Sequence, residues 1–477
     1  MDDSINLEDV DDFASPPPVP SSDIGLDGQP TFVPNDAILD DSGVERPDEI
    51  MEDVISTAPD GTPQEPEKPT EPVSEHGTVR RFATILNLLN SLLGAGILGV
   101  PGSMTHVGLV PSVLIIILIA VLSHIATLLT IKLQRRVGAE GFDDLAYKVF
   151  GKFGSISLSI MIMLFSYSCN VAYLVIGTDS VVSFFRMGKI ILNKIWQRAI
   201  VTVILWAVFP GALTFLKDIT FLQYASFINF GCVTFFVIAM IVKTIQILPK
   251  EGVSKDITFG TFGIGIFSAI SIYGLAFALP VVVLPIIEPY NKNIRKRGIV
   301  SLWSFILCCF FVAVPGILCY LMLGSEAGSN VLNAFAAKDP KDYIITVVQA
   351  AFLIVVCCSY PAVAQSLICS WAALIFKVDS PKVLSTPKRL ICVAMANVIP
   401  LGLAMFLPNV GPALSIGGAF GGCLADFFFP PAMWVKISKK PISHWQNILN
   451  IIFAIFGIIC CIIATTLAII DCIKAFK

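Results

Sequence analysis

This sequence has little charge for its length. Charged side chains make up only 14% of its 477 residues, whereas a soluble protein averages about 25%. So few charges cannot cover a water-facing surface of this size. This deficit excludes a nucleic-acid-binding protein and an ordinary cytosolic enzyme.

The short patterns of enzymes, zinc sites and disulfide-rich proteins are also missing. The chain has four histidines and neither H-E-x-x-H nor G-x-S-x-G, so an integral-membrane enzyme has little support. Its 13 cysteines lie in or beside apolar stretches without C-x-x-C spacing. We therefore expect buried thiols, without zinc, disulfides or a cofactor. The first long apolar run begins after Arg81, too late for a signal peptide.

Charge is distributed unevenly along the chain. Residues 1–79 hold 21 acidic side chains against two basic ones, together with 12 of the 30 prolines and no apolar periodicity. Such a segment buries too little surface to offset its ordering entropy. We therefore expect a disordered acidic cytosolic tail over 1–79 and a transmembrane domain over 80–477. The alternative interpretation is a tail that folds in part on a cytosolic partner.

Apolar stretches long enough to cross a bilayer recur from Phe82 onward. A helix needs about 20 apolar residues to cross a hydrocarbon core of about 30 Å. We expect eleven spans, numbered in chain order, at 83–108, 112–133, 156–185, 199–216, 221–247, 263–288, 300–323, 343–376, 388–407, 410–435 and 447–470. The sequence therefore predicts an all-α polytopic protein with eleven transmembrane helices in a lipid bilayer.

Lys and Arg in the loops predict the orientation. With the N-terminus in the cytosol, the inner loops carry nineteen of these residues and the outer loops carry eleven. Because basic residues accumulate on the cytosolic side, a cytosolic N-terminus is favoured. The sequence does not distinguish the plasma membrane from a vacuolar or lysosomal one.

Two predicted spans contain helix-breaking residues near their middle. Span one reads NSLLGAGILGVP from Asn90 to Pro101, and span six reads SIYGLAFALPVVVLPIIEPY from Ser271 to Tyr290. Gly and Pro weaken helices, and unwound backbone survives in a membrane only against protein or a cavity. Interrupted spans at matching positions in two halves are typical of inverted-repeat transporters. Close packing of small residues is the alternative explanation.

Further motifs along the membrane domain resemble those of one transporter family. Beside NSLLGAGILGVP, they are Ile176-Gly177-Thr178-Asp179, Val283-Leu284-Pro285-Ile286, Ser359-Tyr360-Pro361, Asn409-Val410-Gly411 and Phe429-Pro430-Pro431-Ala432. Over roughly 79–470 the chain thus resembles the amino acid/auxin permeases. The resemblance implies a leucine-transporter-type 5+5 inverted repeat with broken helices 1 and 6. It also implies secondary active transport of amino acids, by symport or antiport, with sodium ions or protons.

The two breaks supply candidate substrate contacts. These candidates are Gly94, Ala95, Gly96, Ile97, Asn170, Tyr173, Tyr273, Gly274 and Phe277. Freed N–H groups at the first break suit the carboxylate of an amino acid. Asn170 and Tyr173 share one helix face, and Tyr273 and Phe277 lie where they would wall a side-chain pocket. The alternative for these four is ordinary packing. The expected substrate is a neutral amino acid.

The sequence offers two candidate sites for coupling transport to an ion. The family resemblance implies a sodium site at the first-span carbonyls, with Asn90 and Ser359 as side-chain ligands. Proton coupling would need a titratable group, and Asp179 in span three is the candidate. Of the other acids within spans, Glu288 suits an ion-pair gate or a proton site, and Asp426 is assigned only a structural role.

The acidic tail leaves a second function open. A chain with this membrane domain is either a carrier or an amino-acid sensor that signals through the tail. Tail deletion separates the two, because a carrier would keep transport whereas a sensor would lose its signal.

Overall fold

The structure is a computed structural model that describes residues 79–192, 194–215, 221–378 and 381–475. The predicted tail therefore lies outside the described residues, except for Val79. Helices make up most of the described part, which contains no strand. This all-helical content agrees with the prediction.

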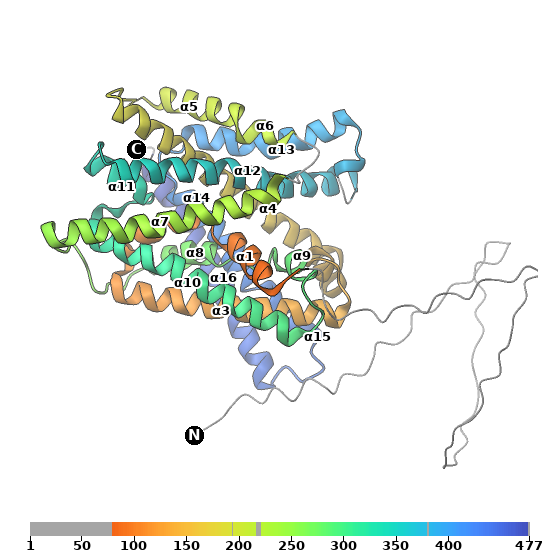
Figure 1. Cartoon of the computed structure of the whole chain (residues 1–477). Helices are drawn as coiled ribbons and strands as arrows, with labels where there is room; N and C mark the ends of the chain where they lie inside the picture. The colour runs from red at the N-terminus through yellow and green to blue at the C-terminus, as the bar shows by residue number, and fades with distance from the viewer. Residues whose placement is uncertain (1–78, 193, 216–220, 379–380, 476–477) are drawn as a thin grey trace, which may run out of the picture. The chain divides into compact units, whose positions relative to one another are not determined.

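In the part of the chain that the structure describes, the α-helices run from α1 to α16 in chain order, and Figure 1 labels most of them. Their bounds are α1 Arg81–Leu92, α2 Val100–Val107, α3 Leu109–Val137, α4 Phe142–Met187, α5 Ile195–Val208, α6 Pro210–Thr214, α7 Phe221–Glu251, α8 Gly265–Ala276, α9 Val283–Ile287, α10 Ile294–Leu323, α11 Val331–Lys338, α12 Tyr343–Phe376, α13 Thr386–Phe406, α14 Gly411–Gly417, α15 Phe429–Ile437 and α16 Trp445–Ala475. Every predicted span range contains helix. By length and composition, eight helical segments of the described residues are long and apolar enough to cross a membrane.

The three other predicted spans are interrupted or short. They are span one (α1 and α2), span four (α5 and α6) and span six (α8 and α9). Each half of a broken helix is too short to cross a membrane by itself, even when the two halves together are long enough. The count of eleven crossings stays a prediction.

Span one breaks where its glycines lie. Helix α1 ends at Leu92, Gly94 is extended, and a short 3₁₀ turn covers Ala95–Leu98 before α2 begins at Val100. Pro101 lies in the first turn of α2, where a missing N–H costs no hydrogen bond. The chain therefore changes helix near the middle of this span, as its sequence predicts.

Span six is broken at the matching position. Helix α8 ends at Ala276, residues 277–282 are not α-helical, and α9 covers only Val283–Ile287. Figure 1 shows α1 (orange), α8 and α9 (green) among the long helices. Both predicted breaks are confirmed.

The two halves of the sequence interleave around these breaks. Helix α2 of span one packs against α8 of span six, and α4 of span three packs along α12 of span eight. The partners in each pair are five spans apart, which is the relation expected between two inverted repeats. The substrate candidates on α4 and the ion candidate on α12 are thereby brought to one region.

Three features of the fold differ from the prediction. Helix α4 begins at Phe142, before the expected span at 156, and bends at Gly151, whose φ is +71°. A short helix, α11, precedes α12 and is capped by the Asn330 side chain. A π-helix occupies Gly418–Asp426 within span ten. A glycine kink, a side-chain cap and close helix packing produce these three features. The hydrophobic pattern of the sequence does not predict any of them.

Candidate functional site

Polar groups from four spans meet at the first break. The hydroxyl of Tyr173 on α4 faces the backbone of Ala95 and the hydroxyl of Ser359 on α12. Asn229 on α7 donates from Nδ2 to Ser359 Oγ at 2.9 Å. We call Ala95, Tyr173, Asn229 and Ser359 the central polar cluster. Three of its members were predicted from sequence, and the structure brings them together.

Glycine at position 94 permits this approach. An ideal Cβ on Gly94 would lie 3.0 Å from the Tyr173 hydroxyl oxygen, which is tighter than ordinary contact. The first N–H groups of a helix have no partner inside it, so the turn that starts at Ala95 offers such donors beside Tyr173. The break therefore places the Tyr173 phenol against the unwound backbone at Ala95.

Several buried amide side chains near this region have unused hydrogen-bonding atoms. Both polar atoms of Asn170, one turn before Tyr173, are buried without a partner among the described residues, as are Oδ1 of Asn90 and Oδ1 of Asn229. Buried polar groups are nearly always paired, and each one left unpaired costs about 1–3 kcal/mol. These atoms are candidates for contact with a ligand.

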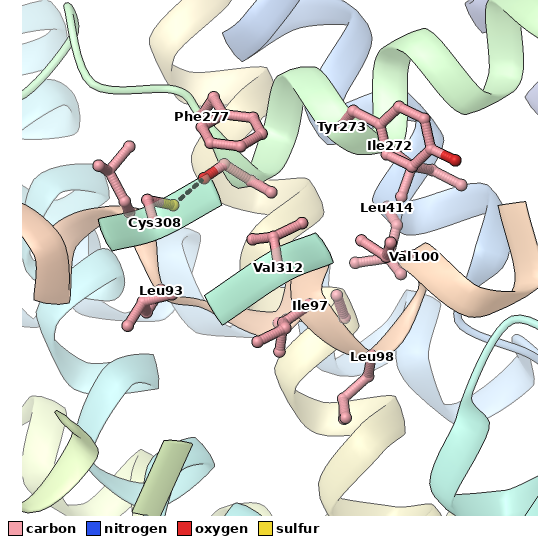
Figure 2. Close-up of a cluster of buried hydrophobic side chains, with 14 of the residues drawn as sticks. Leu93, Ile97, Leu98, Val100, Ile272, Tyr273, Phe277, Cys308, Val312 and Leu414 are labelled. Atoms are coloured by element: carbon pink, nitrogen blue, oxygen red, sulfur yellow. Dashed lines mark hydrogen bonds between the residues drawn. The ribbon is translucent and has the colours of Figure 1, made fainter. Parts of the chain in front are cut away.

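Apolar side chains fill the space around the two breaks. Figure 2 shows Leu93 and Ile97 of the first break in one buried cluster with Phe277, Cys308 and Val312. The Cys308 thiol donates to the Ala276 carbonyl at 3.5 Å, and so satisfies a carbonyl at the end of α8. The surroundings of the break are thus polar on one side and apolar on the other.

Phe277 and Tyr273 lie in different surroundings. Phe277 is fully buried and stacks on Phe305 with ring centroids 6.3 Å apart. The Tyr273 hydroxyl instead faces Ser103 of α2 and Ser112 of α3, and the two rings diverge from α8 in Figure 2. Both rings therefore belong to the buried cluster of Figure 2 that contains Ile97, and Tyr273 also carries a polar group into it.

The last two substrate candidates, Gly96 and Gly274, lie where the backbones of two spans approach closely. A Cβ on Gly96 would lie 3.5 Å from the Ala276 nitrogen, so spans one and six touch at this point. A Cβ on Gly274 would lie 3.4 Å from Cα of Gly422 in the π-helix. Gly96 thus lies between the two breaks, whereas Gly274 faces span ten.

Asp179 lies apart from the central polar cluster. It follows Tyr173 by six residues on α4, or about 9 Å along the helix. Its Oδ1 accepts from Arg198 at 2.6 Å and its Oδ2 accepts from Asn330 at 3.2 Å. Asp179 and Arg198 border a cavity of about 200 Å³. The structure thus pairs Asp179 with an arginine and does not bring it to Asn90 or Ser359.

Sequence patterns alone do not predict a role for Asn229, Arg198 or Asn330. Asn229 had a usable signal, because an amide within a strongly apolar helix is costly unless it has a role. Arg198 lies in the first turn of α5 and Asn330 caps α11, and only the fold shows that they reach Asp179.

A family comparison covers most of the chain. The family described as transmembrane amino acid transporter protein matches residues 78–470. The chain belongs to this family. It is therefore a multi-pass membrane protein of an amino acid transport family, and the resemblance to amino acid permeases is confirmed.

Two individual proteins illustrate the family and the fold. The sodium-coupled neutral amino acid symporter 2 of Danio rerio is 23% identical over 403 residues, which cover 78% of this chain and 79% of that protein. The structure of MHP1, a nucleobase-cation-symport-1 family transporter in a closed conformation with bromovinylhydantoin bound, has a TM-score of 0.54 at 16% identity. That match covers 84% of this chain and 94% of MHP1. This match shows that the chain and MHP1 share a fold.

Proposed function

We propose that this chain is a sodium-coupled symporter of neutral amino acids that works by alternating access around the two breaks. The observation that carries the proposal is the central polar cluster, which joins spans one, three, five and eight beside unwound backbone. The Danio rerio relative, whose name states sodium coupling and neutral amino acids, supports it.

The substrate carboxylate is assigned to the first break. Backbone N–H groups between Gly94 and Ile97 and the Tyr173 hydroxyl supply donors, and the helix that follows presents its positive end. Asn170 has a free donor and a free acceptor one turn away, which suits the ammonium or carboxylate of the same molecule.

The residues at the breaks favour an uncharged substrate side chain. Among the described residues, the central polar cluster and the apolar cluster around Ile97, Phe277 and Val312 contain no charged side chain. A charged substrate group would be buried there without an ion partner, which is costly. An aliphatic side chain would instead gain from contact with the apolar cluster.

Sodium coupling is assigned to oxygen atoms at the same break. Asn90, Ser359 and Asn229 each offer a side-chain oxygen, and the unwound first span offers carbonyls. A hard cation prefers several such oxygens. Asn229 orients Ser359 through its 2.9 Å hydrogen bond, and it has a free Oδ1 of its own.

The test is uptake of radiolabelled amino acids into liposomes that hold the purified protein, with sodium and proton gradients imposed separately. We expect accumulation of neutral amino acids driven by an inward sodium gradient. Accumulation that follows only the proton gradient would refute sodium coupling. Absence of amino acid uptake under every gradient would refute the transport proposal itself.

Ser359→Ala is expected to weaken the binding of sodium more than the binding of substrate. Loss of one ligand oxygen in a buried site costs about 1–3 kcal/mol, or about 5- to 150-fold in affinity. The sodium concentration that gives half-maximal uptake should rise by that factor, while uptake recovers at saturating sodium. The matched control is Ser370→Ala on the same helix, where the hydroxyl bonds only the Ser366 carbonyl. Equal sodium constants in the two variants would remove Ser359 from the ion site.

Asp179→Asn distinguishes a structural ion pair from proton coupling. Because the change leaves Arg198 without its carboxylate, we expect a loss of about 1–3 kcal/mol in unfolding free energy and an unchanged sodium constant. Thermal unfolding and sodium-dependent uptake measure the two effects. If protons drive transport through Asp179, the variant will instead lose the dependence of uptake on pH.

Orientation and the tail complete the proposal. The N-terminus is assigned to the cytosol of a plasma or vacuolar/lysosomal membrane, and the boundary between tail and membrane domain to about residue 80. Deletion of residues 1–78 should leave uptake by the purified protein intact. If a cytosolic protein that co-purifies with the full chain is lost on deletion, the tail is its binding segment.

A further inference from the structure

Asp426 lies in the interior of span ten and has no partner in the part of the chain that the structure describes. Its side chain is 0% exposed, and neither Oδ1 nor Oδ2 has a hydrogen-bond partner among the described residues. The ion pairs found there do not include it. Asp179, the other acid this deeply buried, has both oxygens engaged. Asp426 is therefore in a different chemical situation and needs another explanation.

Asp426 ends the π-helix that covers Gly418–Asp426. A π-helix inserts extra residues into a turn and often occurs at functional sites. Asp426 precedes Ile437, the last residue of α15, by eleven residues. This separation is about 16 Å along a helix. A carboxyl group at that depth lies far from either water-facing end of a span of about 30 Å.

The π-helix packs directly on the broken helix of span six. A Cβ on Gly418 would overlap the Ser271 carbonyl, and a Cβ on Gly422 would lie 2.7 Å from Cα of Gly274. Both contacts are on α8, whose end at Ala276 is the second break. Any movement of α8 at the break therefore changes the packing of the element that carries Asp426.

Few titratable groups surround this carboxyl. Cys423 is on the same π-helix, and Cys460 and Cys461 of α16 face Cys423. The other elements packed against the π-helix are α3, α4, α8, α14 and α15. None of their described side chains forms an ion pair or hydrogen bond with Asp426. Asp426 thus has no cationic side chain from residues 79–192, 194–215, 221–378 or 381–475 to balance an ionised carboxylate.

We propose that Asp426 is a proton-binding site linked to the conformation of spans six and ten. In the arrangement seen here it is a neutral carboxylic acid, because an isolated carboxylate without a partner is very unfavourable in such surroundings. When α8 moves away and water enters, the O–H bond breaks, the proton passes to water and the carboxylate is solvated. The proposal rests on the alternating access proposed above, and adds a proton to the sodium-coupled cycle.

The protonation state is tested directly by infrared spectroscopy of the full-length protein in lipid at neutral pH. A protonated carboxyl group has a carbonyl stretch that a carboxylate lacks. We expect wild type to show this band and Asp426→Asn to lose it. The matched control is Asp471→Asn, on α16, whose carboxylate is 52% exposed beside Lys474, and this variant should keep the band. An unchanged band in Asp426→Asn would overturn the proposal.

The link to conformation is tested by exchange of labelled for unlabelled amino acid across liposomes over a range of pH. Wild type and Asp471→Asn should show the same pH dependence. Asp426→Asn mimics the protonated acid and should lose that dependence while still exchanging substrate. A pH profile like that of wild type in Asp426→Asn would overturn the link.

A second variant and the infrared measurement test Asp426 even if the asparagine variant or the transport assay fails. Asp426→Ser, which removes the carboxyl group with a smaller side chain, is measured in parallel in case the asparagine variant does not insert. If wild type exchanges no amino acid, the proposed function falls, but the infrared comparison still decides whether Asp426 holds a proton.

Discussion

Replacement of Gly96 by valine is expected to abolish amino acid uptake while the protein still inserts into the membrane. A Cβ at this position would lie 3.5 Å from the Ala276 nitrogen and 3.6 Å from its Cα and Cβ, so a single methyl group would already be in contact with span six. The two γ-methyls of valine would press spans one and six apart. Overpacking of this kind costs about 1–3 kcal/mol, or roughly 5- to 150-fold in affinity.

The same side chain would also obstruct the backbone donors between Gly94 and Ile97, so both effects reduce uptake. The control is Gly96→Ala, whose single methyl makes ordinary contact with Ala276 and should preserve most of the uptake. Both variants are compared with wild type by radiolabelled uptake at equal amounts of inserted protein. Uptake by Gly96→Val close to wild type would be incompatible with a carboxylate site at this break.

Gly418→Ala is expected to lower the thermal stability of the transporter strongly. The added Cβ would overlap the Ser271 carbonyl of α8. Because a backbone carbonyl cannot rotate away as a flexible side chain can, the two helices must separate. We expect a cost of about 3 kcal/mol or more in unfolding free energy, seen as a lower melting temperature of the purified protein in detergent.

Gly402→Ala is the matched control for this prediction. Gly402 lies within α13, and a Cβ there has no heavy atom within 4 Å. Alanine is a better helix former than glycine by up to about 1 kcal/mol, so this variant should melt at the same or a higher temperature. Equal melting temperatures for the two variants would mean that the π-helix and α8 are not in the contact described.

The sequence was sufficient to predict the two breaks and much of the central polar cluster. Gly94, Gly96 and Pro101 mark the first break, and Gly274, Pro280 and Pro285 mark the second, because these residue types weaken helices wherever they occur. Tyr173 and Ser359 follow from periodicity and from family resemblance.

The partners of buried polar groups could not be predicted in this way. Asn229 and Ser359 are 130 residues apart, and Arg198 reaches Asp179 from the start of α5. Such contacts depend on how helices pack, which the hydrophobic pattern of one span does not specify. The π-helix likewise depends on how closely Gly418 and Gly422 approach α8, since helix type responds to tertiary contact.

The Cys308 thiol, fully buried against the Ala276 carbonyl, gives this protein an internal reporter. A maleimide or a mercurial can modify that sulfur only from a conformation in which the end of α8 is uncovered. If the twelve other cysteines are replaced, the labelling rate follows the population of that conformation. Substrate and sodium can then be ranked by how far each changes the rate, even in a membrane preparation where no net flux occurs.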